Sequence, residues 1–276
     1  MKIRIWINVF LFFFIIFLLA NLFLEKKDAE KKISLLTNIN SDTIDEIYIQ
    51  RKSLENIIFK KQNEKWSMDF PFKITANAQR IESILEILKV PVYAKFDVDS
   101  IDPVQFDLKN PRILLKLNER QLLFGTTNPI DQKRYILFGK NIYIIEDALY
   151  PQLMTNPIFF IDNKVLPNEA RITSINYPNY NFKINDNTWQ STSTKYSVEQ
   201  IKKIIYKWES MIAVSISKYE EIETKKRISI KTSSNKQIDF MILATHPYLI
   251  LGREDLGIQY NIGNDDAKLI LDKPDP

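Results

Sequence analysis

The chain has 276 residues, of which 45% are hydrophobic and 26% charged, with a net charge of +4 and no cysteine. Its 17 Phe, 12 Tyr and 4 Trp provide enough apolar surface for packed cores, so the composition excludes a disordered stalk. Lysine and arginine are spread among 34 acidic residues, and we therefore predict no nucleic-acid partner. The lack of cysteine is compatible with an oxidising compartment.

Residues 5–24 form an uncharged, mostly apolar run. A helix of this length would cross a hydrocarbon core of roughly 30 Å, so we predict a transmembrane anchor there. Residues 1–4 would be a cytoplasmic N-terminus and residues 25–40 a juxtamembrane linker. A cleaved signal peptide is the alternative, but its apolar region is usually only about 7–15 residues long and ends in a small-x-small site, which residues 18–20 lack.

The orientation of this anchor depends on two opposing signals. Lys2 and Arg4 precede the apolar run, whereas four lysines follow it within residues 25–32, and this count alone favours a cytoplasmic C-terminal region. A short N-terminus ahead of a long apolar run behaves as a signal anchor, and large domains translocate largely regardless of charge. We therefore predict a single-pass inner (cytoplasmic) membrane protein with an extracytoplasmic C-terminal domain.

Two segments that lie 120 positions apart have the same helical apolar pattern. Residues 78–88 predict a half-buried helix, and the corresponding segment, residues 198–208, begins after a capping box formed by Ser197 and Gln200. The matching apolar positions are Ala78, Ile81, Ile84, Leu85 and Leu88, and Val198, Ile201, Ile204, Ile205 and Trp208.

The neighbours of these two helices also follow in the same order. The matching segments are residues 57–66 and 180–189, 112–116 and 226–231, and 135–139 and 248–252. Each pair reads as strands and turns, and each of the first two segments ends in tryptophan. A further short helix is expected within residues 146–154.

From this order we predict an α+β fold in which the transmembrane helix precedes two tandem repeats. Each repeat would be an antiparallel sheet with one main packing helix. The repeats would cover residues 41–162 and 168–272, joined near residues 163–168, and residues 273–276 would be a frayed tail.

Several short motifs lie within the first repeat. They are KWSMDFP at residues 65–71, ANAQRI at 76–81, LFGTTNP at 123–129 and RY at 134–135. Together they resemble the membrane-anchored family called domain of unknown function 4340, best over residues 40–160. One departure is residues 104–108, which lack the glycine of the family pattern. The resemblance implies an envelope protein with one N-terminal span and an extracytoplasmic domain. Some relatives lie beside transporter or gliding-motility auxiliary proteins, and no catalytic residues are implied.

The residues that could carry chemistry are few. A single histidine, His246, cannot form a usual zinc site or a Cys-His pair without cysteine. Asp97, Asp99 and Asp102 resemble a calcium loop, but the sixth position is Asp102 instead of glycine and the twelfth is Leu108 instead of glutamate. The five glycines form no phosphate-binding loop or nucleophile elbow. We therefore predict no catalytic, cofactor-binding or metal residue, no cofactor, and no enzymatic activity.

Two functional hypotheses remain from the sequence. The first is a non-enzymatic, membrane-tethered interaction or accessory module of the cell envelope, with a protein partner such as a transporter or a multiprotein complex. The second is a tethered domain that binds a small molecule, lipid or glycan in the cleft between the repeats. Trp66 and Trp189 occupy matching places, and we expect them in the cores, with a ligand-stacking platform as the alternative.

Overall fold

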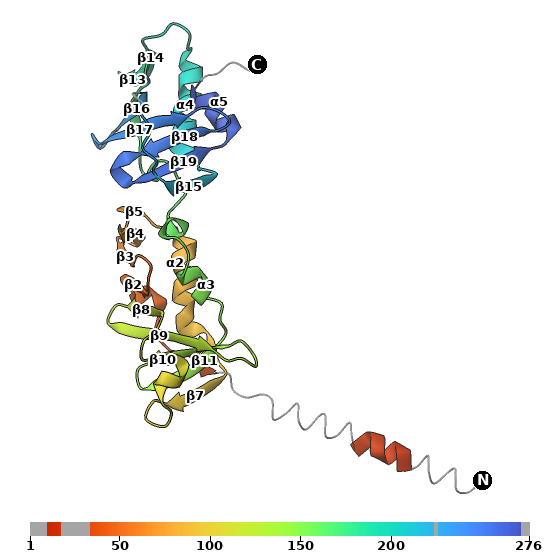
Figure 1. Ribbon diagram of the computed structural model, residues 1–276. Helices are drawn as coiled ribbons and strands as arrows, with labels where there is room; N and C mark the ends of the chain where they lie inside the picture. Colours follow the sequence, from red (N-terminus) through yellow and green to blue (C-terminus); the bar gives the residue numbers. More distant parts are fainter. Residues whose placement is uncertain (1–9, 18–33, 224–225, 272–276) are drawn as a thin grey trace, which may run out of the picture.

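The computed structural model describes residues 10–17, 34–223 and 226–271, and this part of the chain is mostly β-sheet (Figure 1). It forms three sheets, in which all strand pairs are antiparallel. The predicted fold class is therefore wrong on two counts. Strands dominate over helices, because most apolar segments alternate with a period of two, and the expected membrane-spanning helix is not found.

The predicted transmembrane helix, residues 5–24, is described only over residues 10–17, which are helical and exposed. Residues 5–9 and 18–24 lie outside the described part, as do residues 1–4 and 273–276 and most of the predicted juxtamembrane linker. Within the described ranges, no helix is long and apolar enough to cross a membrane.

The first large sheet contains nine strands, in the order β5-β4-β3-β2-β8-β9-β10-β11-β7. In chain order these strands are β2 (Glu46–Arg51), β3 (Ile57–Gln62), β4 (Lys65–Phe70), β5 (Ile74–Thr75), β7 (Ala94–Asp97), β8 (Ile113–Leu117), β9 (Arg120–Thr127), β10 (Arg134–Phe138) and β11 (Asn141–Ile145). In β8 buried and partly exposed residues alternate along the strand, because one face of the sheet covers the core. A small separate sheet pairs β1 (Ser34–Leu35) with β6 (Pro91–Val92).

The second large sheet contains eight strands, in the order β14-β13-β12-β16-β17-β18-β19-β15. In chain order these strands are β12 (Ile172–Asn176), β13 (Asn181–Asn185), β14 (Thr188–Ser191), β15 (Ser215–Lys218), β16 (Arg227–Thr232), β17 (Gln237–Ala244), β18 (Leu249–Arg253) and β19 (Ile258–Ile262). Without β5, the first sheet has the same sequential order, since β2, β3 and β4 correspond to β12, β13 and β14, and β7 to β11 correspond to β15 to β19.

The main helices occupy matching places in the two halves. Helix α2 (Ala78–Leu85) continues into the 3-10 helix η2 (Glu86–Lys89), and both lie between β5 and β6 in the chain. Helix α4 (Val198–Ser210) lies between β14 and β15, and its capping box is formed as the sequence predicts. Four of the five residues in each predicted apolar stripe are buried. These residues are Ile81, Ile84, Leu85 and Leu88, and Ile201, Ile204, Ile205 and Trp208. The first residue of each stripe, Ala78 or Val198, is exposed.

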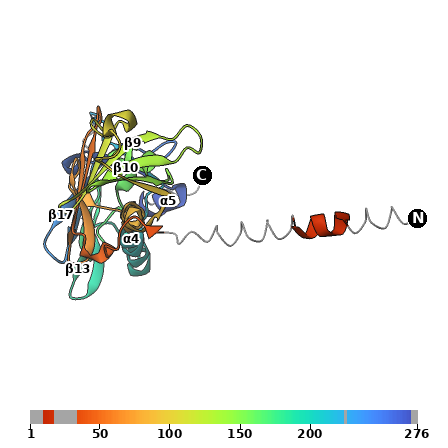
Figure 2. The same ribbon diagram turned by 90° about the horizontal axis from the view of Figure 1, so that it is seen from below.

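The remaining helices are short. They are η1 (Ser41–Thr43), η3 (Pro103–Phe106), α3 (Tyr150–Leu153), η4 (Pro157–Phe160), η5 (Glu254–Leu256) and α5 (Asn264–Leu271). The two large sheets lie one above the other, with α2 beside the first and α4 beside the second (Figure 1). Seen from below, α4 and α5 lie to one side of strands β13 and β17 (Figure 2). The sheets therefore meet end to end at the junction between the halves.

One expected correspondence between the halves is wrong. The sequence pairs Gly139 with Gly252, but Gly139 lies in the turn after β10, whereas Gly252 lies inside β18. The structural counterpart of Gly139 is Gly257. Gly139 lies between β10 and β11, and Gly257 lies between the corresponding strands β18 and β19. Both have a positive φ, of 61° and 68°, which glycine adopts without steric cost. A Cβ at Gly252 would instead collide with the ring of Tyr219.

Candidate binding sites at the junction of the two sheets

The connecting segment, residues 161–165, is extended and forms hydrogen bonds on both of its sides. On the side of the first sheet, the Asp162 N–H donates to the carbonyl oxygen of Thr75, the last residue of β5, at 3.1 Å. The Asn77 N–H donates to the carbonyl oxygen of Phe160 at 2.8 Å. The chain leaving the first half is therefore paired with the edge of its own sheet.

On the side of the second sheet, the same segment pairs with the residues just before β15. The Val165 N–H donates to the carbonyl oxygen of Met211 at 3.1 Å, and the Ala213 N–H donates to that of Asn163 at 2.9 Å. Val165 is also buried. The sequence predicts a turn-rich linker here, whereas the segment is a hydrogen-bonded bridge that fixes the two sheets to each other.

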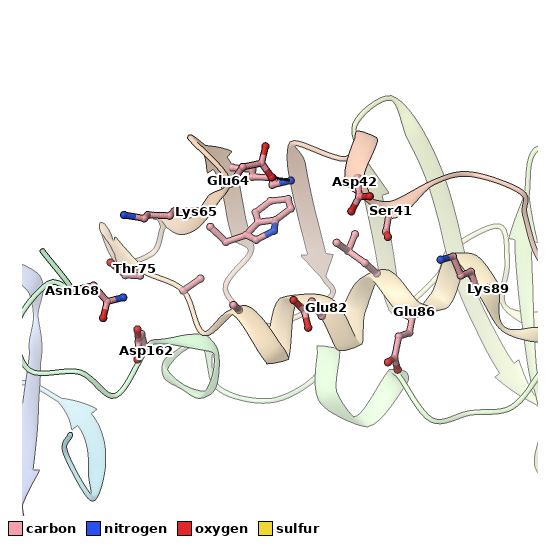
Figure 3. Close-up of a pocket in the computed structure, with 15 residues that line it drawn as sticks. Ser41, Asp42, Glu64, Lys65, Thr75, Glu82, Glu86, Lys89, Asp162 and Asn168 are labelled. Atoms are coloured by element: carbon pink, nitrogen blue, oxygen red, sulfur yellow. Dashed lines mark ion pairs between the residues drawn. The ribbon is translucent and has the colours of Figure 1, made fainter. Parts of the chain in front are cut away.

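Three hollows surround this bridge. The first, the α2 groove, has a volume of about 450 Å³ and lies between η1, the β3–β4 hairpin and α2 (Figure 3). Trp66 lines it while remaining only 8% exposed, so the tryptophan belongs mainly to the core, as expected. Trp189 is buried to the same degree in β14. Five acidic and three lysine side chains line this groove.

Most of the lysine charge in the α2 groove is already paired. Lys61 Nζ lies 2.7 Å from Glu64 Oε2, and Lys65 forms an ion pair with Glu169 of the second half. Hydrogen bonding to Lys65 lowers the pKa of the Glu169 carboxyl below its usual value. Because both side chains of this pair are exposed, water screens it, and it contributes little to stability.

The second hollow, the β15 groove, has a volume of about 450 Å³ and separates the edge strand β15 from η4. Strand β15 has β19 as its one neighbour in the sheet that the structure describes. The side chains of Ile158, Phe159, Val214 and Ile216 make part of the groove apolar, and Val214 is 72% exposed.

Arg80 of α2 supplies the main charge of the β15 groove. Its guanidinium carbon lies 3.8 Å from the centre of the Phe159 ring, a cation–π contact. Burial lowers the pKa of this guanidinium from its ordinary value, although the group stays protonated. Lys218 adds a second positive charge, and no acidic side chain lines this groove among the described residues. The β15 groove therefore places positive charge beside an edge strand whose other side faces η4.

The third hollow, the junction pocket, has a volume of about 330 Å³ and receives side chains from both halves and from the connecting segment. Asp162 and Lys164 line the junction pocket, whereas Asn163 lines the β15 groove. Successive residues of an extended segment point to opposite sides, so the bridge separates the two hollows. Buried Tyr260 and Arg253 line the pocket from the second half.

His246 and the three aspartates that the sequence suggested for chemistry lie away from these hollows. His246 is exposed in the connection between β17 and β18, and its Nδ1 lies 3.4 Å from the hydroxyl of Thr245. Asp97 Oδ1 accepts a hydrogen bond from the Asp99 N–H at 2.9 Å, and Asp102 caps η3. The carboxylates of Asp97 and Asp102 thus make local turn and capping contacts, and no group of three or more potential metal ligands occurs in the described ranges.

The charged residues of the junction were not predicted from the sequence. Arg80 lies outside the predicted apolar stripe of its helix, and its contact with Phe159 depends on a residue far along the chain. The basic residues of the junction pocket come from four separate segments, so no local spacing brings them together.

Comparison with known families identifies the chain. The model of the family described as "Domain of unknown function (DUF4340)" matches residues 66–232. The chain belongs to the DUF4340 family. The DUF4340 match begins at Trp66 in β4 and ends at Thr232 in β16, so it crosses the connecting segment and includes parts of both sheets. Of residues 40–160, where the motif resemblance is strongest, the match covers residues 66–160, and it continues past them to residue 232. No curated protein and no solved structure matches the chain.

Two of the DUF4340 motif residues have a structural role in the first sheet. A Cβ at Gly125 would collide with the carbonyl oxygen of Phe106 and with the Leu108 side chain, so glycine permits this close approach. Arg134 donates a hydrogen bond to the Gly125 carbonyl and forms an ion pair with Asp147. These motif residues therefore stabilise the sheet away from the three hollows.

Proposed function

We propose that this DUF4340 protein is a non-enzymatic interaction module that binds an extended segment of a partner protein along the edge of β15. The observation that carries the proposal is the place where the backbone pairing between the connecting segment and the second sheet ends. The backbone of this segment pairs with residues 211–213 but not with residues 214–218, which face η4 across the β15 groove. A partner strand placed there would continue the same pattern of backbone hydrogen bonds.

The charge of the β15 groove indicates the chemistry of the partner. Arg80 and Lys218 present positive charge, and the groove has no acidic lining residue in the described part of the chain. Val214 and Ile216 provide apolar contacts along the strand. A segment that alternates apolar residues with aspartate or glutamate would satisfy both features, because alternate side chains of a strand point to the same face.

Peptide binding tests this proposal directly. A labelled synthetic peptide that alternates valine and glutamate should bind the protein, and the same peptide with prolines at alternate positions should not, because proline lacks the N–H that a strand edge requires. The double variant Arg80→Gln, Lys218→Gln should weaken binding by about tenfold or more, since it removes two charge-assisted contacts. Fluorescence anisotropy measures all of these affinities.

Two exposed apolar positions provide a matched comparison. Val214 and Tyr206 are both 72% exposed, but Val214 lines the β15 groove and Tyr206 lies on α4. Val214→Asp should abolish peptide binding, because it adds negative charge to the groove, whereas Tyr206→Asp should leave binding unchanged. Equal affinity of the glutamate and proline peptides, or equal effects of the two aspartate variants, would contradict the proposal.

The second candidate function is a binding domain for a small molecule, lipid or glycan between the halves. The specific observation in its favour is the junction pocket, which lies where this ligand would be expected. The cell-envelope role and the placement outside the cytoplasm stay predictions. The family membership is compatible with them but does not establish them.

A further inference from the structure

The junction pocket has an excess of positive charge. Four basic side chains line it, Lys73, Lys164, Lys236 and Arg253, against two acidic ones, Asp69 and Asp162. Lys73 comes from the turn before β5, Lys164 from the connecting segment, and Lys236 from the β16–β17 turn. The positive charge therefore surrounds the pocket from both halves of the molecule.

The two acidic side chains already have partners. Asp69 Oδ2 lies 3.1 Å from Lys60 Nζ, outside the pocket lining, and Asp162 Oδ1 accepts a hydrogen bond from the Lys164 N–H at 3.2 Å. Lys73 and Lys236 form no ion pair with any residue that the structure describes. An anionic ligand would thus meet two lysines that form no direct ion pair, although the Asp255 carboxylate interacts with Lys236 at longer range.

Two buried residues that line the pocket each have a donor group without a protein acceptor among the described residues. The Tyr260 side chain is 1% exposed, and within the described ranges its hydroxyl has no hydrogen bond. Arg253 uses Nε and Nη2 to bind Asp255, both at 2.8 Å, and its Nη1 forms no hydrogen bond with a described residue. Because a buried polar group without a partner costs free energy, such groups point to an acceptor that binds there.

The Tyr260 hydroxyl can act only as a neutral donor or acceptor near neutral pH. Burial is the main reason that the pKa of Tyr260 rises to about 12. A neutral phenol can donate to an anionic oxygen, whereas a phenolate would repel it. Because burial outweighs the opposing effect of Arg253, the hydroxyl keeps its proton and can act as a donor.

We propose that the junction pocket binds a small molecule that carries a phosphate group, with Lys73 and Lys236 contributing charge and Tyr260 and Arg253 contributing hydrogen bonds. Lysine acts as a point charge toward phosphate, and a phosphate group has enough oxygens to accept from several directions at once. The volume of about 330 Å³ suits a small phosphate ester. This proposal is independent of peptide binding at β15, because the connecting segment separates the two hollows.

Calorimetric titration of the full chain tests the proposal with a matched pair of probes. Glycerol 3-phosphate should show saturable binding, and glycerol, which lacks the phosphate, should show none. The affinity for glycerol 3-phosphate should fall as salt concentration rises, because salt screens the exposed lysines. No detectable binding of glycerol 3-phosphate at low salt would overturn the proposal.

Two sets of variants locate the site. Tyr260→Phe removes only the hydroxyl and should weaken binding by about tenfold, since a hydrogen bond to a charged group is lost. It should leave the unfolding temperature of the free protein unchanged, because this hydroxyl has no partner within the protein. The double variant Lys73→Gln, Lys236→Gln should weaken binding to a similar degree and should reduce its dependence on salt.

Matched controls use a tyrosine and a lysine on the exposed side of α4. Tyr206→Phe and Lys202→Gln should bind glycerol 3-phosphate as the unmodified chain does, since neither residue lines the pocket. If Tyr260→Phe fails to fold, the lysine double variant carries the test alone, because both lysines are exposed. Equal affinity of the double variant, the controls and the unmodified chain would overturn the proposal.

Discussion

Arg134 is a buried charge whose contacts hold one end of the first sheet together. Its Nη2 lies 2.7 Å from Asp147 Oδ2, and its guanidinium carbon lies 3.6 Å from the centre of the Tyr150 ring. It also donates to the carbonyl oxygen of Gly125. The side chain therefore joins β9, β10 and the segment after β11, and its charge is compensated by a carboxylate that is itself only 23% exposed.

Replacing this arginine should be costly. Arg134→Met would leave Asp147 without its partner in a largely buried place, and we expect a loss of about 3 kcal/mol in the free energy of unfolding. Chemical denaturation measures this loss. Lys60→Met is the control, because its ion pair with Asp69 is exposed and screened by water, so this variant should lose much less stability. Equal losses in the two variants would show that the Arg134 pair is not important for stability.

At the scale of residues, the sequence predicts burial better than it predicts contacts. Trp66 and Trp189 were expected in the cores because each follows a hairpin, and both are buried. Arg134 and Gly125 appear in the sequence only as parts of motifs, and their contact requires the pairing of β9 with β10. Arg80 was missed for the same reason, because periodicity assigns a face to a side chain but does not identify what covers that face.

The two main helices begin with side-chain caps of different kinds. Asn77 Oδ1 accepts from the Arg80 N–H at 3.2 Å, and Ser197 Oγ accepts from the Gln200 N–H at 3.3 Å. In α4 the Gln200 side chain also accepts from the Ser197 N–H at 2.8 Å, which completes the capping box. Matching helices in the two halves thus satisfy their first N–H groups with different residues.

Removal of either cap should destabilise the protein by a similar amount. Asn77→Ala and Ser197→Ala should each lower the free energy of unfolding by about 1 kcal/mol, because a helix N–H loses its acceptor. Ser210→Ala at the other end of α4 is the control. Its hydroxyl bonds to the carbonyl oxygen of Tyr206 within the helix, a contact that adds little stability. Denaturant titration would contradict this expectation if Ser210→Ala were as harmful as Ser197→Ala.

At the scale of elements, helical periodicity predicts α2 and α4 because their apolar stripes have a single phase. It does not predict that residues 86–89 tighten into a 3-10 helix, since the same residues are buried in either form. The α+β class is wrong because each half has one main helix but a much larger number of short strands. The hydrophobic run at residues 5–24 illustrates a different limit, since hydropathy alone does not establish the extent of a helix.

The end-to-end arrangement of the sheets depends on the connecting segment, which the sequence assigns to a turn-rich linker. Asparagine and proline near residues 163–168 favour turns in general, but here Val165 and Leu166 are buried, and Val165 pairs with the second half. Local composition cannot reveal this pairing, because the partner residues 211–213 lie far along the chain. The strand order of each half was easier to predict, since it is mostly built from neighbouring hairpins.

This pairing should make the two halves unfold together. We expect the unmodified protein to show one calorimetric transition. Val165→Pro would remove the N–H that donates to Met211, and two separate transitions should then appear. A proline substitution at exposed Ser234, in the turn after β16, is a control that should lower the transition temperature without splitting the transition. Two transitions in the unmodified protein would contradict this expectation.

The bridge also sets an order of assembly during synthesis. The first sheet is complete in the chain at β11, before β12 begins, so it can form while the second half is still being made. One side of the connecting segment can pair as soon as it emerges, because β5 precedes it. Its other side must wait for residues 211–213. The junction pocket, which needs residues from β18 and β19, is consequently the last of the three hollows to be completed.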